Sequence, residues 1–415
     1  MLEQFYDHPS RIQSLRDGLG GLLLEGFASE LYQRGYAKRT ARKHIRAAEH
    51  FLYWTHKECI PISSLTEKSL ERFYRHLDQC QCPRYGHSQR SQLLNGARLC
   101  LKHLQSVGVT TATAIESVAQ DPVLLDEFCQ WMHQQRGTSD STLKNYRRPI
   151  RDLLKRFGED PARFDARSLR KFVLERNQQS GWAAAKTCTT ALRMFLRFLI
   201  AEGRCADGLY AAIPVLAHWR LSTIPRYVQP EKVERIITSC DLSSPVGRRN
   251  RAILLLLTRL GLRAGDIIKL RLDDIDWEGA WLYVSGKGRR QTRLPLTQKV
   301  GYAIVDYLQN VRPQTDTDVL FIRSRAPFCA FGSSCAISVI VSRAMHRAGV
   351  THQSRGATHV LRHSAATSML RQGASLQDIA TILRHRSIET TQIYAKVDLN
   401  TLRQIAQPWP EVQPC

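Results

Sequence analysis

Hydrophobic side chains recur every three or four residues over long parts of the N-terminal half of the chain, which is the period of one helix face. One such run covers residues 27–54 and a second covers residues 124–154. Within each run a threonine, Thr40 or Thr142, precedes a basic stretch with apolar positions at helical spacing. The pattern predicts helical modules, with a basic amphipathic helix opening at each threonine.

The two runs are similar to each other. Arg34-Gly35 precedes Thr40 at the same spacing as Arg136-Gly137 precedes Thr142. We interpret this as a duplicated small helical domain, because two copies are too few for a solenoid. The alternative is a coincidence of two common amphipathic patterns. Pro149 lies inside the second basic helix and is predicted to kink or interrupt it.

The C-terminal half mixes helix and strand patterns. Residues 206–230 are rich in glycine and proline, and this predicts an interdomain linker. Farther on, the β-prone segments 281–284 and 292–296 flank a turn at 286–290. The helices expected around them lie at 231–239, 248–260, 334–348, 359–372, 375–384 and 387–396.

These elements together predict a mainly α protein with a small β-sheet in its C-terminal domain. We expect two helical modules, at 1–115 and 118–205, followed by a linker at 206–228. A mixed α/β domain with a C-terminal tail would occupy residues 229–415.

Net charge points to a polyanionic partner. The 415 residues include 60 Lys and Arg against 37 Asp and Glu, a formal net charge of +23. Such an excess indicates nucleic acid, the alternative being a basic but merely solvated surface. The N-terminus lacks a basic start followed by an apolar run, and the most apolar stretch, Ala252–Leu257, is too short for a membrane span. We expect a cytoplasmic, nucleoid-associated protein that binds double-stranded DNA.

The 11 cysteines are odd in number and scattered, which favours reduced thiols in a cytosolic protein. Cys80 and Cys82 are closer together than the usual pair of zinc ligands, and no second ligand pair follows them. His76 and His87 lie nearby, so an unusual zinc site remains the alternative. We expect no metal and no cofactor.

Four short motifs in the C-terminal domain fit one reaction, phosphoryl transfer on a DNA backbone. Arg263 follows Gly261-Leu262, and Arg362 stands three positions after His359, so on a helix the latter two share a face. Two guanidinium groups can grip the nonbridging phosphate oxygens without a metal. We predict this role for Arg263 and Arg362.

Tyr394 is the predicted nucleophile. A phenol has a pKa near 10, so it needs nearby positive charge and a base, for which His359 is the candidate. His385 would donate a hydrogen bond to the phosphate. Attack would form a 3′-phosphotyrosine and release a 5′-oxygen that Lys287, on the turn, would protonate. Rejoining then needs no ATP, because the phosphotyrosine keeps the reactivity of the broken bond.

These residues resemble the tyrosine recombinase (phage integrase) family. That family has an arginine in a Gly-Leu-Arg turn, a hairpin lysine, a His-x-x-Arg helix, a second histidine and, shortly after it, a tyrosine. The resemblance is strong over residues 225–400 and looser over 120–205, where it implies a SAM-like helical core-binding domain; residues 22–115 look like a further module of this kind. The matching residues are Arg263, Lys287, His359, Arg362, His385 and Tyr394.

Three positions depart from the family pattern. Ala264-Gly265-Asp266 stands where Ile-Ser-Glu is frequent, Val360 replaces an aspartate and Arg384 replaces a glycine. Asp266 keeps a carboxylate, and we expect it to orient a neighbouring active-site group. The alternative role for Asp266 is to pair with a helix N-terminus.

Basic residues outside this set are expected to contact the DNA backbone, because phosphate contacts dominate such interfaces. The alternative is a solvated helix face. These residues are Arg42, Lys43 and Arg46 in the first module, Lys144, Arg147, Arg148 and Arg151 in the second, and Arg289 and Arg290 on the turn.

The resemblance implies a site-specific recombinase or integrase of a mobile element or phage. It would act as a homotetramer on paired DNA sites through a Holliday junction, with accessory recombinases or directionality factors as further partners. The tail after Tyr394 would dock on its own domain or on a neighbouring subunit. The alternatives are a type IB topoisomerase and a non-catalytic DNA-binding accessory factor of the same fold. Taken singly, each of the six residues fits a surface charge, a structural histidine or a packed aromatic; one phosphoryl-transfer site accounts for them all.

Overall fold

The computed structural model divides the chain into two compact units. One combines Met1–Thr110 with Leu221–Cys415, and the other is Thr111–Arg220. The predicted turn residues Lys287, Arg289 and Arg290 lie outside the described residues, as does His87, and the expected three-domain division stays a prediction. The described residues are 1–82, 89–110, 121–216, 224–285, 291–351, 356–398 and 402–404.

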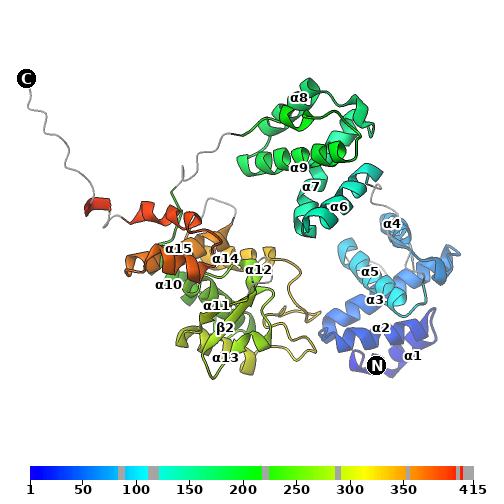
Figure 1. The fold of residues 1–415 in the computed structure, drawn as a ribbon. Coiled ribbons are helices and arrows are strands. Elements are labelled where there is room, and N and C mark those ends of the chain that lie inside the picture. Colours follow the sequence, from blue (N-terminus) through cyan, green and yellow to red (C-terminus); the bar gives the residue numbers. More distant parts are fainter. Residues whose placement is uncertain are drawn as a thin grey trace, which may run out of the picture. The chain divides into compact units, whose positions relative to one another are not determined.

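Helices make up the described part of residues 1–110 (Figure 1). Ile45 and Phe51 of α3 are fully buried and pack with Phe27 of α2 and Phe73 of α4. The helix α3 begins two residues before Thr40, so the predicted start was slightly wrong. The elements are η1 (Leu2–Gln4), α1 (Pro9–Arg16), α2 (Gly21–Gln33), α3 (Lys38–Lys57), η2 (Ile62–Ser64), α4 (Glu67–His76) and α5 (Arg90–Ser106).

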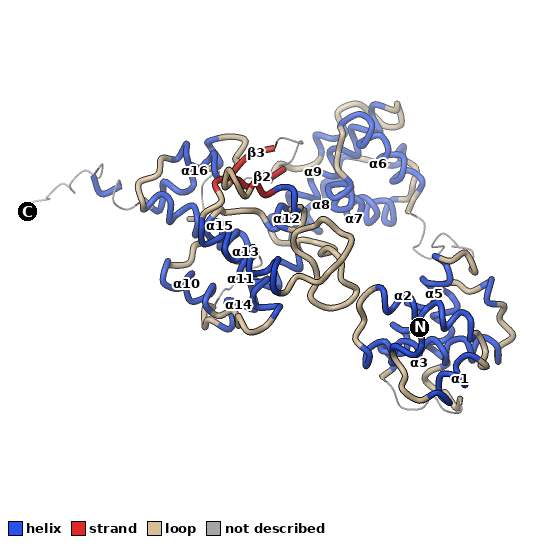
Figure 2. The backbone as a smooth tube through the Cα atoms, turned by 90° about the horizontal axis from the view of Figure 1, so that it is seen from below, coloured by secondary structure: helices blue, strands red, loops and turns tan. Residues whose placement is uncertain are grey.

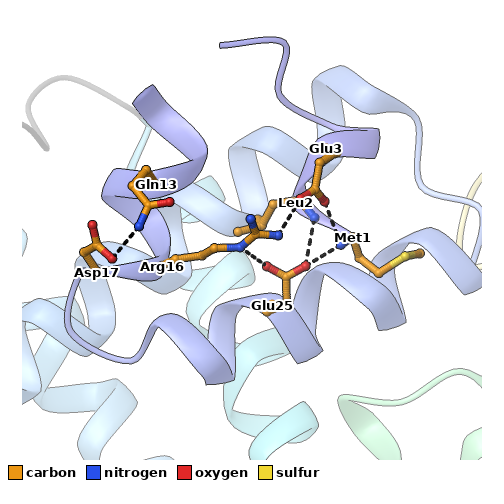
Figure 3. Close-up of polar contacts among 7 residues, drawn as sticks. All are labelled: Met1, Leu2, Glu3, Gln13, Arg16, Asp17 and Glu25. Atoms are coloured by element: carbon orange, nitrogen blue, oxygen red, sulfur yellow. Dashed lines mark hydrogen bonds and ion pairs between the residues drawn. The ribbon is translucent and has the colours of Figure 1, made fainter. Parts of the chain in front are cut away.

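A group of ion pairs joins α1, α2 and η1 (Figure 3). Glu25 accepts hydrogen bonds from Arg16 Nε at 3.1 Å and from the backbone N–H of Leu2 at 3.3 Å, and Arg16 also pairs with Glu3. The terminal amine of Met1, a backbone hydrogen bond and Arg16 together lower the pKa of Glu3 to about 2. Because these side chains are largely exposed, solvent screens the pairs, and they orient the helices more than they stabilise them.

Residues 121–216 form the second, helical unit. Phe128, Ile150 and Phe195 are fully buried in its core, and Ile213, expected in the linker, is buried there too. Pro149 lies inside α7 without ending it. The elements are α6 (Val123–Arg136), α7 (Asp140–Phe157), η3 (Pro161–Arg163), α8 (Ala166–Gln178), α9 (Trp182–Ala201) and η4 (Leu209–Ala212).

One antiparallel sheet, in the order β1-β2-β3, accompanies the helices of residues 224–398 (Figure 2). Leu282 and Val284 of β2 and Leu294 of β3 are buried in the core with α11, which confirms the two predicted strands and the buried helix. The elements are α10 (Pro230–Thr238), α11 (Pro245–Arg259), α12 (Ala264–Ile267), η5 (Leu272–Asp274), β1 (Ile275–Asp276), β2 (Trp281–Ser285), β3 (Gln291–Pro295), α13 (Gln298–Asn310), α14 (Cys335–Arg347), α15 (Ala357–Arg371) and α16 (Leu376–Leu383).

The segment after α16 differs from the predicted structure. Residues 387–396 do not form the expected α-helix but two 3-10 turns, η6 (Ile388–Thr390) and η7 (Gln392–Val397). The segment is rich in β-branched residues, which lose side-chain freedom in an α-helix, and Ser387 caps η6 by accepting the N–H of Glu389. Among the described residues no helix is both long and apolar enough to cross a membrane.

Candidate active site

A tight turn after α11 positions the first predicted arginine. Gly261 has a φ of +59°, and a Cβ at this position would lie 2.5 Å from Leu383 Cδ2, so the turn requires glycine. Arg263 precedes α12, and its backbone N–H donates to Asp266 Oδ2 at 3.1 Å. The turn therefore sets the place of Arg263 through backbone geometry.

Arg362, on α15, is the second predicted arginine and is only 6% exposed. Its Nη1 donates to the carbonyl of Gly261 and its Nη2 to the carbonyl of Leu383. Burial, with a contribution from Arg263, lowers the pKa of Arg362 to about 10, so the guanidinium stays charged at neutral pH. It joins the ends of two helices and carries a buried positive charge.

Tyr394 lies in η7 and packs in an apolar cluster with Ala366, Ile379 and Leu383. The side chain is 1% exposed. Its hydroxyl forms a hydrogen bond of 2.9 Å with Nδ1 of His363, and the two rings lie 5.6 Å apart. His363 was not among the residues predicted from the sequence.

The tyrosine and its histidine partner are both kept neutral. Burial raises the pKa of Tyr394 to about 12, although Arg362 opposes the shift. Burial, followed by the nearby His359 and Arg362, lowers the pKa of His363. Near neutral pH the hydrogen bond therefore joins a protonated phenol to an uncharged imidazole.

His359 was the predicted base, but the Tyr394 hydroxyl forms its hydrogen bond with a different histidine, His363. His359 lies in the first turn of α15, where burial and then Arg362 and Arg263 lower its pKa. Helical spacing places it on the same face as Arg362 and His363. A sequence signal for His363 did exist, because it stands four positions after His359 and directly after Arg362.

His385 follows α16 and is oriented by a threonine. Its Nδ1 forms a hydrogen bond of 2.7 Å with Thr391 Oγ1, which leaves Nε2 as the ring nitrogen able to bind a phosphate. Burial, then Arg362 and Arg263, lower the pKa of His385 to about 4. The ring is therefore uncharged unless a negative group arrives beside it.

A third guanidinium belongs to Arg384, the position where the resembled family often has glycine. Its φ is +54°, in the left-handed region that favours glycine, and its carbonyl accepts from Arg263 Nη2 at 3.3 Å. The Arg384 side chain is 6% exposed and forms an ion pair with Asp266, which is 13% exposed. Its Nε and Nη1 have no hydrogen-bond partner among the described residues. Asp266 makes both of the contacts that were considered for it: it pairs with Arg384, and it accepts the N–H of Arg263 at the start of α12.

Together these contacts gather three guanidinium groups and three histidines near one phenol. Asp266 is the carboxylate that pairs with one of these guanidinium groups, so positive charge is in excess among the described residues of the site. Such an arrangement binds an anion and stabilises charge that develops on a phosphoryl group. Lys287, predicted to complete it, lies outside the described residues.

The predicted DNA-contact residues fall into two groups. Arg42 forms an ion pair with Asp7 at 2.7 Å, and Arg147 and Arg151 both pair with Asp121. The second group is exposed and consists of Lys43 and Arg46 on α3 and Lys144 and Arg148 on α7. Their contact with DNA stays a prediction.

Two family models match the chain. The model described as the phage integrase family matches residues 226–400, which contain all six predicted catalytic residues. The model described as the phage integrase N-terminal SAM-like domain matches residues 125–203.

Curated relatives agree with these matches. A putative integrase/recombinase, y4rA, of Sinorhizobium fredii (strain NBRC 101917 / NGR234) is 36% identical and covers 92% of this chain and 93% of its own length. Tyrosine recombinase XerC of Oceanobacillus iheyensis is 28% identical, covering 68% of this chain and 93% of its own.

Solved structures share the fold. The XerH site-specific recombinase bound to a palindromic difH substrate is 19% identical, with a TM-score of 0.56, over 82% of this chain and 95% of its own. A lambda integrase dimer bound to a core site is 20% identical, with a TM-score of 0.53, over 70% and 98%. The chain belongs to the phage integrase family and is a tyrosine-type recombinase that breaks and rejoins DNA strands.

Replacing Asp266 with alanine is expected to lower the free energy of unfolding by about 3 kcal/mol, because the buried Arg384 charge loses its partner. Urea unfolding of the full chain measures the loss. The matched control, Asp273→Ala on the exposed surface, should stay within about 0.5 kcal/mol of the wild type. If Arg384→Gly added to Asp266→Ala recovered none of the loss, the ion pair would not be its cause.

Stability is expected to fall as the pH drops from about 7 to about 5. The folded chain lowers the pKa of His359, His363 and His385, the last to about 4, so the unfolded chain binds protons first. The stabilisation is complete above about pH 6.5, the ordinary histidine value, and is lost below it, by at most about 1.4 kcal/mol per pH unit for each histidine.

Thermal unfolding at a series of pH values measures this dependence. The variant His385→Asn should show a shallower dependence than the wild type, and His346→Asn, on the exposed surface, should keep the full one. An unchanged slope in His385→Asn would contradict the assignment.

Proposed function

We propose that the chain is a site-specific DNA recombinase or integrase in which Tyr394 attacks the scissile phosphate. The attack forms a 3′-phosphotyrosine and breaks the bond to the 5′-oxygen, and a second 5′-hydroxyl reverses the step on another strand. The observation that carries the proposal is the Tyr394 hydroxyl beside His363, in a site with the buried charge of Arg362. Neither ATP nor a metal enters these steps.

The guanidinium groups bind the phosphate. Arg362 has five N–H donors and uses two of them on the carbonyls of Gly261 and Leu383, so others remain for nonbridging oxygens. Arg263 supplies a second guanidinium group that can donate two hydrogen bonds to the phosphate. Arg384 adds the N–H groups of Nε and Nη1, which have no hydrogen-bond partner among the described residues. His385 donates through Nε2, with its orientation held by Thr391.

Proton transfer uses a base and an acid on either side of the phosphate. His363 Nδ1 takes the proton of Tyr394, because it already forms a hydrogen bond with that hydroxyl. His359 is the alternative base and stands on the same helix face. Lys287 gives a proton to the departing 5′-oxygen, as the sequence predicts.

The buried position of Tyr394 implies a conformational step. A side chain that is 1% exposed does not reach a phosphate of a bound duplex, so η7 must shift before attack. An anion beside Arg362 would also remove part of the positive field that keeps the histidines neutral. We therefore expect binding of DNA and release of the tyrosine to be coupled.

Double-stranded DNA is the proposed substrate, since XerH and lambda integrase are solved on their DNA sites. Modules at 1–115 and 118–205 and a catalytic domain at 229–415 would enclose the duplex, with a homotetramer on paired sites and a Holliday junction as intermediate. A mobile element is the proposed setting, because the relative from Sinorhizobium fredii is named a putative integrase/recombinase. Because the chain acts on DNA, the proposed location is the cytoplasm, at the nucleoid.

Replacing Tyr394 with phenylalanine should abolish the covalent adduct while leaving DNA binding intact. Nicked duplexes made from the DNA that flanks the gene trap the adduct, which denaturing gels detect. We expect a loss of about 10⁴-fold or more, as for removal of a nucleophile. Tyr302→Phe, on the exposed surface, is the control and should form adduct normally. Undiminished adduct in Tyr394→Phe would contradict the assignment. Two further outcomes concern the wild-type chain. Relaxation of supercoils without recombination would favour a type IB topoisomerase. Absence of any adduct with the wild-type chain would favour a non-catalytic accessory factor.

Replacing His363 with asparagine should slow the first cleavage by about 10²-fold or more at neutral pH, because the phenol loses its proton acceptor. The defect should shrink as the pH rises, because more of the tyrosine then ionises without a base. Single-turnover rates on the nicked duplex measure both effects, and His359→Asn is the parallel variant. A wild-type rate in His363→Asn together with a pH-dependent defect in His359→Asn would make His359 the base.

A further inference from the structure

Four side chains in the N-terminal helical region bring potential metal ligands together. Each of His50, His76, Cys80 and Cys82 offers one ligand atom, and these four atoms all lie within 4.8 Å of one another. His50 belongs to α3, His76 is the last residue of α4, and the cysteines lie in the segment that follows α4. The active-site residues are all at 261–394, so this cluster is a separate feature.

Two of the ligand-to-ligand distances are close to the edges of a zinc tetrahedron. Cys80 Sγ lies 3.4 Å from His50 Nε2, and Cys82 Sγ lies 3.4 Å from His76 Nε2. A tetrahedral zinc ion with sulfur at about 2.3 Å and nitrogen at about 2.0–2.1 Å separates these ligands by about 3.6 Å. The side chains thus stand close to the spacing that one ion would impose.

The surroundings suit a closed structural site. His50 is fully buried and Cys82 is 7% exposed. The ring of His76 lies 5.9 Å from Trp54 and 6.1 Å from Phe73, both in the apolar core of this region. A dry wall of this kind excludes water, and four protein ligands leave no open position for a substrate.

The chemical type of the ligands favours zinc. Two imidazoles and two sulfurs in a tetrahedral arrangement are a donor set that Zn²⁺ prefers over magnesium or calcium, which select oxygen ligands. In a reducing compartment the two thiols remain available as thiolate ligands.

We propose that His50, His76, Cys80 and Cys82 bind one structural Zn²⁺ ion. The ion fastens the segment after α4 to α3 and so holds three parts of the N-terminal helical region in register. Metal binding releases the thiol protons and contributes to the folding of this region, because an unfolded chain does not present the four ligands together.

The first test is the metal content of the purified full-length protein, measured by mass spectrometry of the elements. One equivalent of zinc per chain is expected, and Cys80→Ser/Cys82→Ser should lose it. Two matched controls should retain the metal: Cys59→Ser/Cys335→Ser, which changes two exposed cysteines, and His56→Gln, an exposed histidine on the same helix as His50. Absence of zinc in protein from zinc-supplied cells, or zinc that persists in Cys80→Ser/Cys82→Ser, would overturn the proposal.

A second test needs no variant and so does not depend on how the variants fold. The wild-type chain is stripped with a chelator and reloaded with Co²⁺, whose spectrum reports ligand type and geometry. A thiolate-to-cobalt charge-transfer band with intense d–d bands is expected, together with protection of Cys80 from alkylation that Cys59 does not share. A weak octahedral spectrum, or equal alkylation with and without metal, would overturn the site; a Cys80–Cys82 disulfide in peptide maps of fresh protein would do so as well. These tests stand apart from the recombinase proposal, whose readout is the Tyr394 adduct.

Discussion

The buried guanidinium of Arg362 is the interaction on which the active site depends. The last carbonyl groups of a helix lack partners within it, and a buried charge without hydrogen bonds is costly. Arg362 meets both needs by donating to Gly261, just after α11, and to Leu383, at the end of α16. Arg263 and His385 each stand two positions after one of these carbonyls, so this one side chain sets the places of both.

Burial and the same positive charge together explain the electrostatic state of the site. Burial is the main cause of the lowered pKa of His359, His363 and His385, and Arg362 adds to it in each case. Burial keeps the phenol of Tyr394 protonated in spite of this field. Under the proposed function, a phosphate would meet guanidinium groups that are already in place, and fixed charges of this kind lower a reaction barrier.

Long-range pairing of distant segments appears in two places. Asp266 and Arg384 form an ion pair although they are 118 positions apart. The aspartate thereby stabilises an arginine whose backbone conformation favours glycine. In the N-terminal region, His50 lies 30 positions before Cys80, its contact. Local spacing pointed to His76 beside the two cysteines but gave no sign of His50, which belongs to another helix.

The chain's own pattern was enough to predict most of the helical and strand segments around the core. It also pointed to Arg263, His359, Arg362, His385 and Tyr394, which lie close together in the described structure, while their catalytic roles stay predictions. Periodicity reports burial directly, and a motif such as His359 with Arg362 lies on one helix face. The α-helix predicted at 387–396 was wrong. The spacing there is helical, but β-branched residues and the cap at Ser387 favour two 3-10 turns. Only the tertiary structure paired Tyr394 with His363, tied Arg384 to Asp266 and assembled the four-residue cluster at His50. Those contacts join segments that the sequence keeps apart, and packing rather than spacing decides which side chains meet.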